Sequence, residues 1–218
     1  MAKKIAIIFS TLAVLGIIIG VFFKSQKEQQ LTKENESAAQ AQIVRDFSYA
    51  KGNLDSKVTV VEFYDPECEA CKAFHPMGNQ LMSLYGDQIK FVARPMPLHG
   101  SSDMAIRLTY AAGKSGKFWE MFDLLFEKQD EWGHKQFPPL DLFMKYAQSL
   151  GLAPDQIKTL MDSTEIRDMM GLDMADAQSL GVRGTPTIFV NGKKLDSLSF
   201  QDLQIMIESE LKTQNTAQ

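Results

Sequence analysis

The chain has 218 residues, 44% of them hydrophobic, so it can bury one substantial core and most simply forms a single domain with extensions. Its formal net charge is −4, but residues 1–24 hold three of the 23 basic side chains and none of the 27 acidic ones, so the remainder is more acidic still. This charge argues against nucleic acid as a partner, and the presence of only two cysteines excludes a multi-bridge disulfide framework and a four-thiolate zinc site.

The first predicted element is a membrane-spanning helix at residues 5–23, which contain no charged side chain and are flanked by Lys3, Lys4 and Lys24. A helix of this length extends about 28 Å and can cross the hydrocarbon core of a bilayer. The apolar run exceeds the ~7–15 residues usual in a cleaved signal peptide, and no small-x-small site follows it closely. We therefore predict a retained signal anchor at residues 1–24, with cleavage as the alternative. The lysines on its two sides do not settle its orientation.

Residues 25–46 are rich in polar and small side chains, which cannot bury a core, so a polar linker is predicted there. Ile43 to Tyr49 is predicted as an edge strand, because its large apolar residues resume after the linker. The next stretch, Val58 to Phe63, is β-branched and aromatic and predicts a strand buried on both faces. Asp65-Pro66 then ends that strand in a turn.

Cys68 and Cys71 follow this turn at the start of a helix predicted to run to Tyr85. At this spacing two residues lie about 60° apart around a helix, close enough to form a disulfide. The unpaired N–H groups and positive dipole at a helix start favour the thiolate of Cys68, which predicts Cys68 as the nucleophile and Cys71 as the resolving thiol. A bridge across so short a loop contributes little stability, so the pair predicts redox chemistry.

His75 supports an alternative interpretation of the same helix. It lies four residues after Cys71, on nearly the same helical face, and completes a Cys-x-x-Cys-x-x-x-His pattern. The alternative function is therefore a non-enzymatic metal-binding chaperone or redox sensor that uses Cys68, Cys71 and His75.

Beyond the cysteine helix, Ile89 to Arg94 predicts a second strand, and helical spacing then prevails for about eighty residues. This stretch, a helical insertion, contains five predicted helices: 101–112, 117–128, 140–150, 154–161 and 165–180.

The sheet resumes near the C-terminus. Thr187 to Val190 and Lys193 to Leu195 predict a hairpin around Asn191-Gly192, because both turn positions need a positive φ. Phe200 to Leu211 predicts a final helix, and residues 213–218 a flexible tail.

Taken in this order, the strand, the Cys-x-x-Cys helix with Pro76 inside it, the helical insertion and the Gly-Thr-Pro hairpin resemble the DsbA-like thiol:disulfide interchange proteins. The resemblance covers Phe47 to Leu211. It implies an α/β thioredoxin fold at residues 47–212, with a helical insertion at about residues 100–180 between a βαβ half and a C-terminal ββα half. It also implies an enzyme that forms or rearranges disulfides in exported proteins, with the Cys68-Cys71 disulfide as its redox group and no separate cofactor.

The resemblance further implies roles for residues outside the cysteine pair. Pro186 would be a cis-proline facing the disulfide, with Gly184 and Thr185 presenting their backbone to an extended substrate chain. The family places a buried acid six residues before the first cysteine, where this chain has Glu62. Among Val and Phe its carboxylate would be desolvated and its pKa raised, which suits proton exchange with Cys71.

One departure from the family concerns the dipeptide between the cysteines. Strongly oxidising relatives have a histidine just before the second cysteine, whereas this chain has Ala70 there, preceded by Glu69. Lys72 is the only counter-charge close in sequence, so these three residues are predicted to tune the pair toward a weaker oxidant.

The resemblance also implies a cellular setting, because disulfide exchange on folding proteins needs an oxidising compartment. The chain would be attached to the bacterial inner membrane through residues 5–23, with its catalytic domain in the periplasm or extracytoplasmic space. Its partners would be unfolded or folding exported proteins and a membrane or soluble redox partner, with no nucleic acid.

Overall fold

The computed structural model describes residues 42–135, 137 and 139–215, together with the isolated positions 22, 24, 26 and 27. The chain divides into two compact units, Met1–Ala41 and Gln42–Gln218. Apart from Phe22, the membrane span predicted at residues 5–23 lies outside the described residues. Among the residues that are described, none of the helices combines the length and the apolar character needed to cross a bilayer.

Five strands in the described part of the chain form one mixed sheet in the order β1-β3-β2-β4-β5. The central strand β2 (Thr59–Tyr64) runs parallel to β3 (Lys90–Pro95) and antiparallel to β4 (Thr187–Val190). The two edges are β1 (Tyr49–Gly52) and β5 (Lys193–Lys194). A mixed sheet interrupted by a helical insertion is the fold class that the sequence predicted.

Side chains of β2 alternate between the two faces of the sheet. Val61 and Phe63 pack toward α8 (Thr164–Ser179), through Ala177. Val60 packs on the opposite face, where Phe74 of α2 (Glu69–Tyr85) contributes to the same cluster. α9 (Phe200–Asn215) also lies on that face. Alternation places Glu62 between Val60 and Tyr64, so its carboxyl group faces the cysteine helix from the middle of the sheet.

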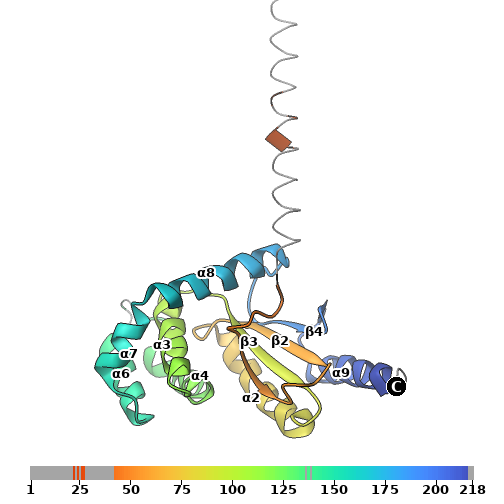
Figure 1. Cartoon of the computed structure of the whole chain (residues 1–218), viewed down its shortest axis with the longest axis horizontal. Coiled ribbons are helices and arrows are strands. Elements are labelled where there is room, and N and C mark those ends of the chain that lie inside the picture. Colours follow the sequence, from red (N-terminus) through yellow and green to blue (C-terminus); the bar gives the residue numbers. More distant parts are fainter. Residues whose placement is uncertain are drawn as a thin grey trace, which may run out of the picture. The chain divides into compact units, whose positions relative to one another are not determined.

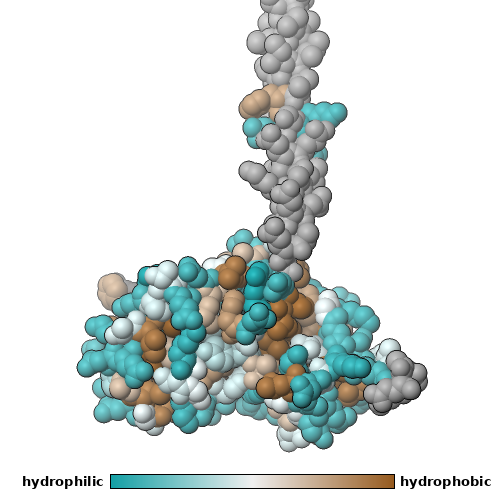
Figure 2. Space-filling view, viewed as in Figure 1, coloured by the Kyte–Doolittle hydropathy of each residue, from teal (hydrophilic) through white to brown (hydrophobic). Residues whose placement is uncertain are grey.

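The helical insertion joins β3 to β4 and ends with α8, which crosses one face of the sheet (Figure 1). Its earlier helices gather to one side of the sheet, with α9 at the opposite end (Figure 1). On the face shown in Figure 2, hydrophilic residues cover most of the visible helices and hydrophobic residues gather toward the middle. The helices before α8 are α3 (Ser102–Lys114), α4 (Phe118–Glu127), α5 (Gln129–Trp132), α6 (Leu140–Ser149) and α7 (Pro154–Met161).

The strand predicted at residues 43–49 is wrong in position, because β1 begins at Tyr49 and ends at Gly52. Ile43 and Val44 instead pack onto the sheet face that α8 covers, so their apolar character reflects burial against the sheet.

Two arginines bind the segment before β1 to the rest of the domain. The Arg45 guanidinium donates hydrogen bonds to both carboxylate oxygens of Asp176 at 2.7 Å. The buried Arg94 guanidinium donates to the carbonyl oxygens of Gln42 and Ile43, each at 2.9 Å. The compact unit therefore starts at Gln42, inside the range predicted as a polar linker.

Candidate active site around Cys68 and Cys71

The two cysteines occupy different environments at the start of α2. Cys68 is the N-cap residue, with an extended backbone (φ −74°, ψ 126°), and is 9% exposed. Cys71 lies one turn further along and is 0% exposed. Both are free thiols in this structure. Of the two, only Cys68 is open to an outside sulfur atom.

The segment before β4 lies directly against Cys68. The Thr185–Pro186 peptide bond is cis, as the family resemblance implied. The Cys68 thiol donates to the Thr185 carbonyl oxygen, with 3.4 Å between Sγ and O. The Thr187 hydroxyl donates to the Gly184 carbonyl at 2.7 Å and closes the turn. The fold thus brings together the cysteine motif and the Gly-Thr-Pro motif, as predicted.

Cys71 is surrounded by groups that act on its ionisation. Burial raises the pKa of the Cys71 thiol well above its usual range, and the nearby Glu62 carboxyl group raises it further. The Asp65 backbone N–H, which donates to Cys71 Sγ at 3.4 Å, and the Thr185 hydroxyl both lower this pKa. The Thr185 hydroxyl is buried and has no hydrogen-bond partner among the described residues. It is therefore available to donate a hydrogen bond to a Cys71 thiolate.

Glu62 is 3% exposed, as its place among apolar strand residues predicted. Burial raises the pKa of its carboxyl group to about 8, while the charge of Lys51 acts in the lowering direction. The Lys51 ammonium itself lies 4.4 Å from the centroid of the Trp119 ring, and burial lowers its pKa. At neutral pH Glu62 is therefore mostly protonated, and it can both give and take a proton near Cys71.

Asp65 holds the loop between β2 and α2. Its carboxylate is fully buried, and it accepts hydrogen bonds from the Glu67 backbone N–H at 2.9 Å and the Ser102 hydroxyl at 2.5 Å. Its other oxygen accepts from the Leu98 backbone N–H at 2.7 Å and lies 2.8 Å from His99 Nδ1. Asp65 is therefore a structural anchor for two loops.

The short helix α5 holds the same loop from the insertion. Gln129 Nε2 donates to the carbonyl oxygens of Pro66 at 2.8 Å and of Cys68 at 3.1 Å. The buried Glu67 carboxylate accepts from the His134 backbone N–H at 2.7 Å. Sequence reasoning did not identify Gln129 or His134, because they lie about 60 residues from the cysteine motif and no local pattern marks them.

The predicted tuning residues have partners that the sequence did not reveal. The Glu69 side chain is 73% exposed, and its carboxylate lies 3.0 Å from His134 Nε2. The Lys72 ammonium lies 2.6 Å from the Asp130 carboxylate, so Lys72 is not a free counter-charge for Cys68. Ala70 is exposed. The dipeptide between the cysteines therefore meets an imidazole supplied by the insertion.

The alternative metal site is not assembled in the described residues, where no group of three or more His, Cys, Asp or Glu side chains is placed to hold a metal ion. His75 instead lies 3.5 Å from the Asp123 carboxylate and stacks on the Phe126 ring at 5.0 Å between centroids. Burial lowers the pKa of His75, although Asp123 acts to raise it.

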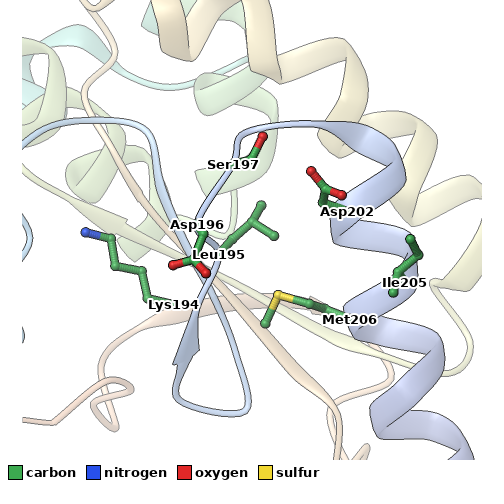
Figure 3. Close-up of a pocket in the computed structure, with 7 residues that line it drawn as sticks. All are labelled: Lys194, Leu195, Asp196, Ser197, Asp202, Ile205 and Met206. Atoms are coloured by element: carbon green, nitrogen blue, oxygen red, sulfur yellow. The ribbon is translucent and has the colours of Figure 1, made fainter.

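A cavity of about 420 Å³ lies between the segment after β5 and helix α9 (Figure 3). The Leu195 backbone N–H donates to the Ile188 carbonyl at 2.8 Å, so the chain after β5 runs back toward the start of β4, where Pro186 lies. The lining residues are Lys194, Leu195, Asp196, Ser197, Asp202, Ile205 and Met206.

The comparisons with known proteins agree on a thioredoxin-like fold. A family model described as Thioredoxin matches residues 46–209. The crystal structure of oxidised BdbD from Bacillus subtilis has a TM-score of 0.71 at 28% sequence identity, covering 79% of this chain and 96% of that one. The structure of a thioredoxin-like oxidoreductase from Silicibacter pomeroyi has a TM-score of 0.68 at 26% identity, covering 78% and 95%.

A longer relative matches in sequence. The Na(+)/H(+) antiporter NhaA of Herminiimonas arsenicoxydans is 28% identical over 193 residues, or 88% of this chain. The chain spans only 29% of that relative's length. The chain is therefore similar in structure to separate proteins of its own size and similar in sequence to part of a larger protein.

Proposed function

The chain belongs to the thioredoxin family, and from this premise we propose that it is a thiol:disulfide oxidoreductase that forms or rearranges disulfides in exported proteins. The observation that carries the proposal is the difference between its two thiols. Cys68 lies at a helix start against the Thr185 carbonyl, whereas Cys71 is inaccessible and has the buried acid Glu62 nearby. This asymmetry supports attack by Cys68 and resolution by Cys71.

In the oxidising direction, a substrate thiolate attacks Sγ of Cys68 in the Cys68–Cys71 disulfide, and the electron pair of the broken S–S bond leaves on Cys71. Glu62, which holds a proton at neutral pH, can protonate the Cys71 thiolate. A second substrate thiolate then attacks the substrate sulfur of the mixed disulfide, which releases Cys68 as a thiolate and leaves a disulfide in the substrate. Two electrons have passed to the cysteine pair, which a membrane or soluble redox partner reoxidises.

In the reverse direction, the Cys68 thiolate attacks a substrate disulfide and expels one substrate thiolate. Cys71 must then lose its proton to attack Cys68 and release the second one. Ionised Glu62 can accept that proton, and the Thr185 hydroxyl can donate a hydrogen bond to the thiolate formed. The same residues therefore serve both directions of exchange.

We place the substrate chain along Gly184, Thr185 and Pro186. An extended peptide can pair with the Thr185 backbone there while its sulfur meets Cys68. The cavity beside β5 and α9 can receive an apolar side chain of the same substrate, because Ile205 and Met206 line it and Ile205 is 57% exposed. Backbone pairing of this kind suits many unfolded sequences, since it does not depend on one side chain.

We base the proposed cellular placement on the predicted membrane span and on the family resemblance. Residues 5–23 would anchor the chain in the inner membrane, residues 25–41 would act as a tether, and the domain that starts at Gln42 would work in the periplasm. The flexible tail predicted at residues 213–218 is wrong in its first half, because α9 continues to Asn215.

The assignment of the cysteines is tested by trapping mixed disulfides in cells that express the full chain. Cys71→Ser should accumulate mixed disulfides with exported proteins through Cys68, because the second thiolate that resolves them is missing. Cys68→Ser is the matched control and should trap nothing. Bands that disappear on reduction and are equally strong in both variants would show that the roles are not divided in this way.

A further inference from the structure

The helix that carries the two cysteines begins without a side-chain cap. Cys68 occupies the N-cap position of α2, and its side chain makes no capping hydrogen bond. Ser, Thr, Asp or Asn usually stands at this position, because its side-chain oxygen accepts a hydrogen bond from a backbone N–H of the first turn. The Cys68 thiol points instead to the Thr185 carbonyl oxygen, to which it donates at 3.4 Å. The start of α2 therefore depends on other groups for its position.

Gln129 of α5 is one of these groups, and it comes from the insertion. Its buried side-chain amide donates through Nε2 to the Pro66 carbonyl at 2.8 Å and to the Cys68 carbonyl at 3.1 Å. The two carbonyls lie on either side of Glu67 in the chain, so one amide group holds both ends of the last turn before the helix. The Cys68 carbonyl also accepts the first backbone hydrogen bond of α2, from the Lys72 N–H at 3.0 Å.

The helix that presents Gln129 is itself fixed in the core of the insertion. The Gly133 N–H donates to the Gln129 carbonyl at 2.7 Å and closes the single turn of α5. Trp132 is fully buried, and its indole N–H donates to the Leu125 carbonyl at 2.8 Å. The Trp132 ring also meets Phe143 edge to face, with 5.4 Å between centroids. The position of the Gln129 amide is therefore set by the packing of the insertion.

Other hydrogen bonds between the insertion and the cysteine loop end on side chains of the loop. The buried Glu67 carboxylate accepts from the backbone N–H groups of Ser101 at 2.6 Å and of His134 at 2.7 Å. These bonds leave the backbone of Cys68 untouched. Among the described residues, Gln129 is the insertion side chain that hydrogen-bonds to the backbone of Cys68.

We propose that Gln129 is a positioning residue for disulfide exchange: by holding the Pro66 and Cys68 carbonyls, it keeps the Cys68 thiol aligned with the Thr185 segment. This inference rests on the proposed function and deepens it. Attack on a disulfide requires the attacking sulfur to lie in line with the S–S bond of a substrate chain bound along Thr185, so a small displacement of Cys68 slows the reaction. A small reagent that meets the thiolate from solvent has no such requirement.

The test compares two rates for Cys68 in the full chain with a Cys71→Ser background. In the first reaction the Cys68 thiolate attacks the disulfide of a neutral, extended peptide, forms a new S–S bond with the peptide and expels the other sulfur as a thiolate. In the second reaction iodoacetamide alkylates Cys68. Both rates follow the thiolate fraction, so their ratio is independent of changes in the ionisation of Cys68. The ratio therefore reports how well the thiol is aligned with a bound peptide.

Gln129→Met keeps the length and the apolar stem of the side chain but donates no hydrogen bond. We expect it to lower the ratio of the peptide rate to the iodoacetamide rate by roughly tenfold, the factor that the loss of one or two hydrogen bonds supports. Thr109→Val is the matched control, because it removes a buried hydrogen bond of 2.9 Å to the Ala105 carbonyl within α3 of the insertion. The ratio for this control should equal that of the original protein.

Gln129→Glu provides an independent variant. Burial beside two carbonyl oxygens raises the pKa of the introduced carboxyl group, so at pH 5.5 it is protonated and can donate one hydrogen bond, whereas its ionised form at pH 8.5 donates none. The ratio should therefore fall between pH 5.5 and 8.5 in this variant and stay constant in the original protein.

Equal ratios for Gln129→Met and the original protein would overturn the inference and leave the proposed function standing. If Gln129→Met does not fold, a ratio for Gln129→Glu that stays constant with pH overturns it. An original protein that alkylates normally but does not react with the peptide disulfide would instead refute the proposed function.

Discussion

Replacing Glu62 with Gln should change how the stability of the protein depends on pH. Below pH 4.5, the ordinary value for this carboxyl group, Glu62 is protonated in the folded and the unfolded chain, so it imposes no ionisation cost. Between pH 4.5 and about 8 only the unfolded chain ionises, because burial raises the pKa of the carboxyl group in the folded protein. The free energy of unfolding therefore falls by ~1.4 kcal/mol per pH unit over this range.

The magnitude follows from the two pKa values. From pH 4.5 to pH 7 the loss amounts to about 3 kcal/mol, and it reaches about 5 kcal/mol when the pH has risen to the folded-state value. Gln has nearly the same shape and cannot ionise. Glu62→Gln should therefore resemble the original protein near pH 4 and be more stable by about 3 kcal/mol at pH 7.

The assay is urea denaturation of the reduced protein at several pH values, followed by the fluorescence of Trp119 and Trp132. Glu127→Gln, which removes an exposed carboxylate from α4, is the matched control and should keep the original pH dependence. Parallel stability curves for Glu62→Gln and the original protein between pH 4.5 and 8 would refute the reasoning, since they would mean that Glu62 ionises equally in both states.

Two further predictions concern Thr185 and the N-terminal segment. Thr185→Val keeps the β-branched shape but removes the hydroxyl that lowers the pKa of Cys71. Release of substrate from the mixed disulfide should therefore slow roughly tenfold, and the release rate is measured by stopping the reaction with acid at short times. An unchanged release rate would show that the hydroxyl does not assist Cys71. In cell fractionation the full chain should remain with the membrane after an alkaline wash, and protease added to spheroplasts should digest the domain. A soluble mature chain would contradict the anchor, and a protected domain would contradict the orientation.

Local sequence patterns were enough to predict most elements of the fold. The hairpin turn is an example, since Asn191 and Gly192 have φ values of 46° and 79°, and the central strand was recognised from its run of β-branched and aromatic residues. Most insertion helices were predicted within two residues of their observed ends, because each spans several turns with a repeating apolar face. The four-residue helix α5 was missed, since so short a segment shows no period.

The sequence by itself was also enough to predict the cysteine pair of the candidate site, because the spacing of Cys68 and Cys71 and the strand before them are local features. Tertiary structure alone decided which charges surround that pair. His134 meets Glu69, and Gln129 binds the Cys68 carbonyl, only because the insertion folds back onto the cysteine loop. Periodicity reports which residues are buried within one element, whereas contacts between distant polar side chains depend on how the elements pack. For that reason the partners of Glu69 and of the Cys68 carbonyl could not be predicted from the neighbouring residues in sequence.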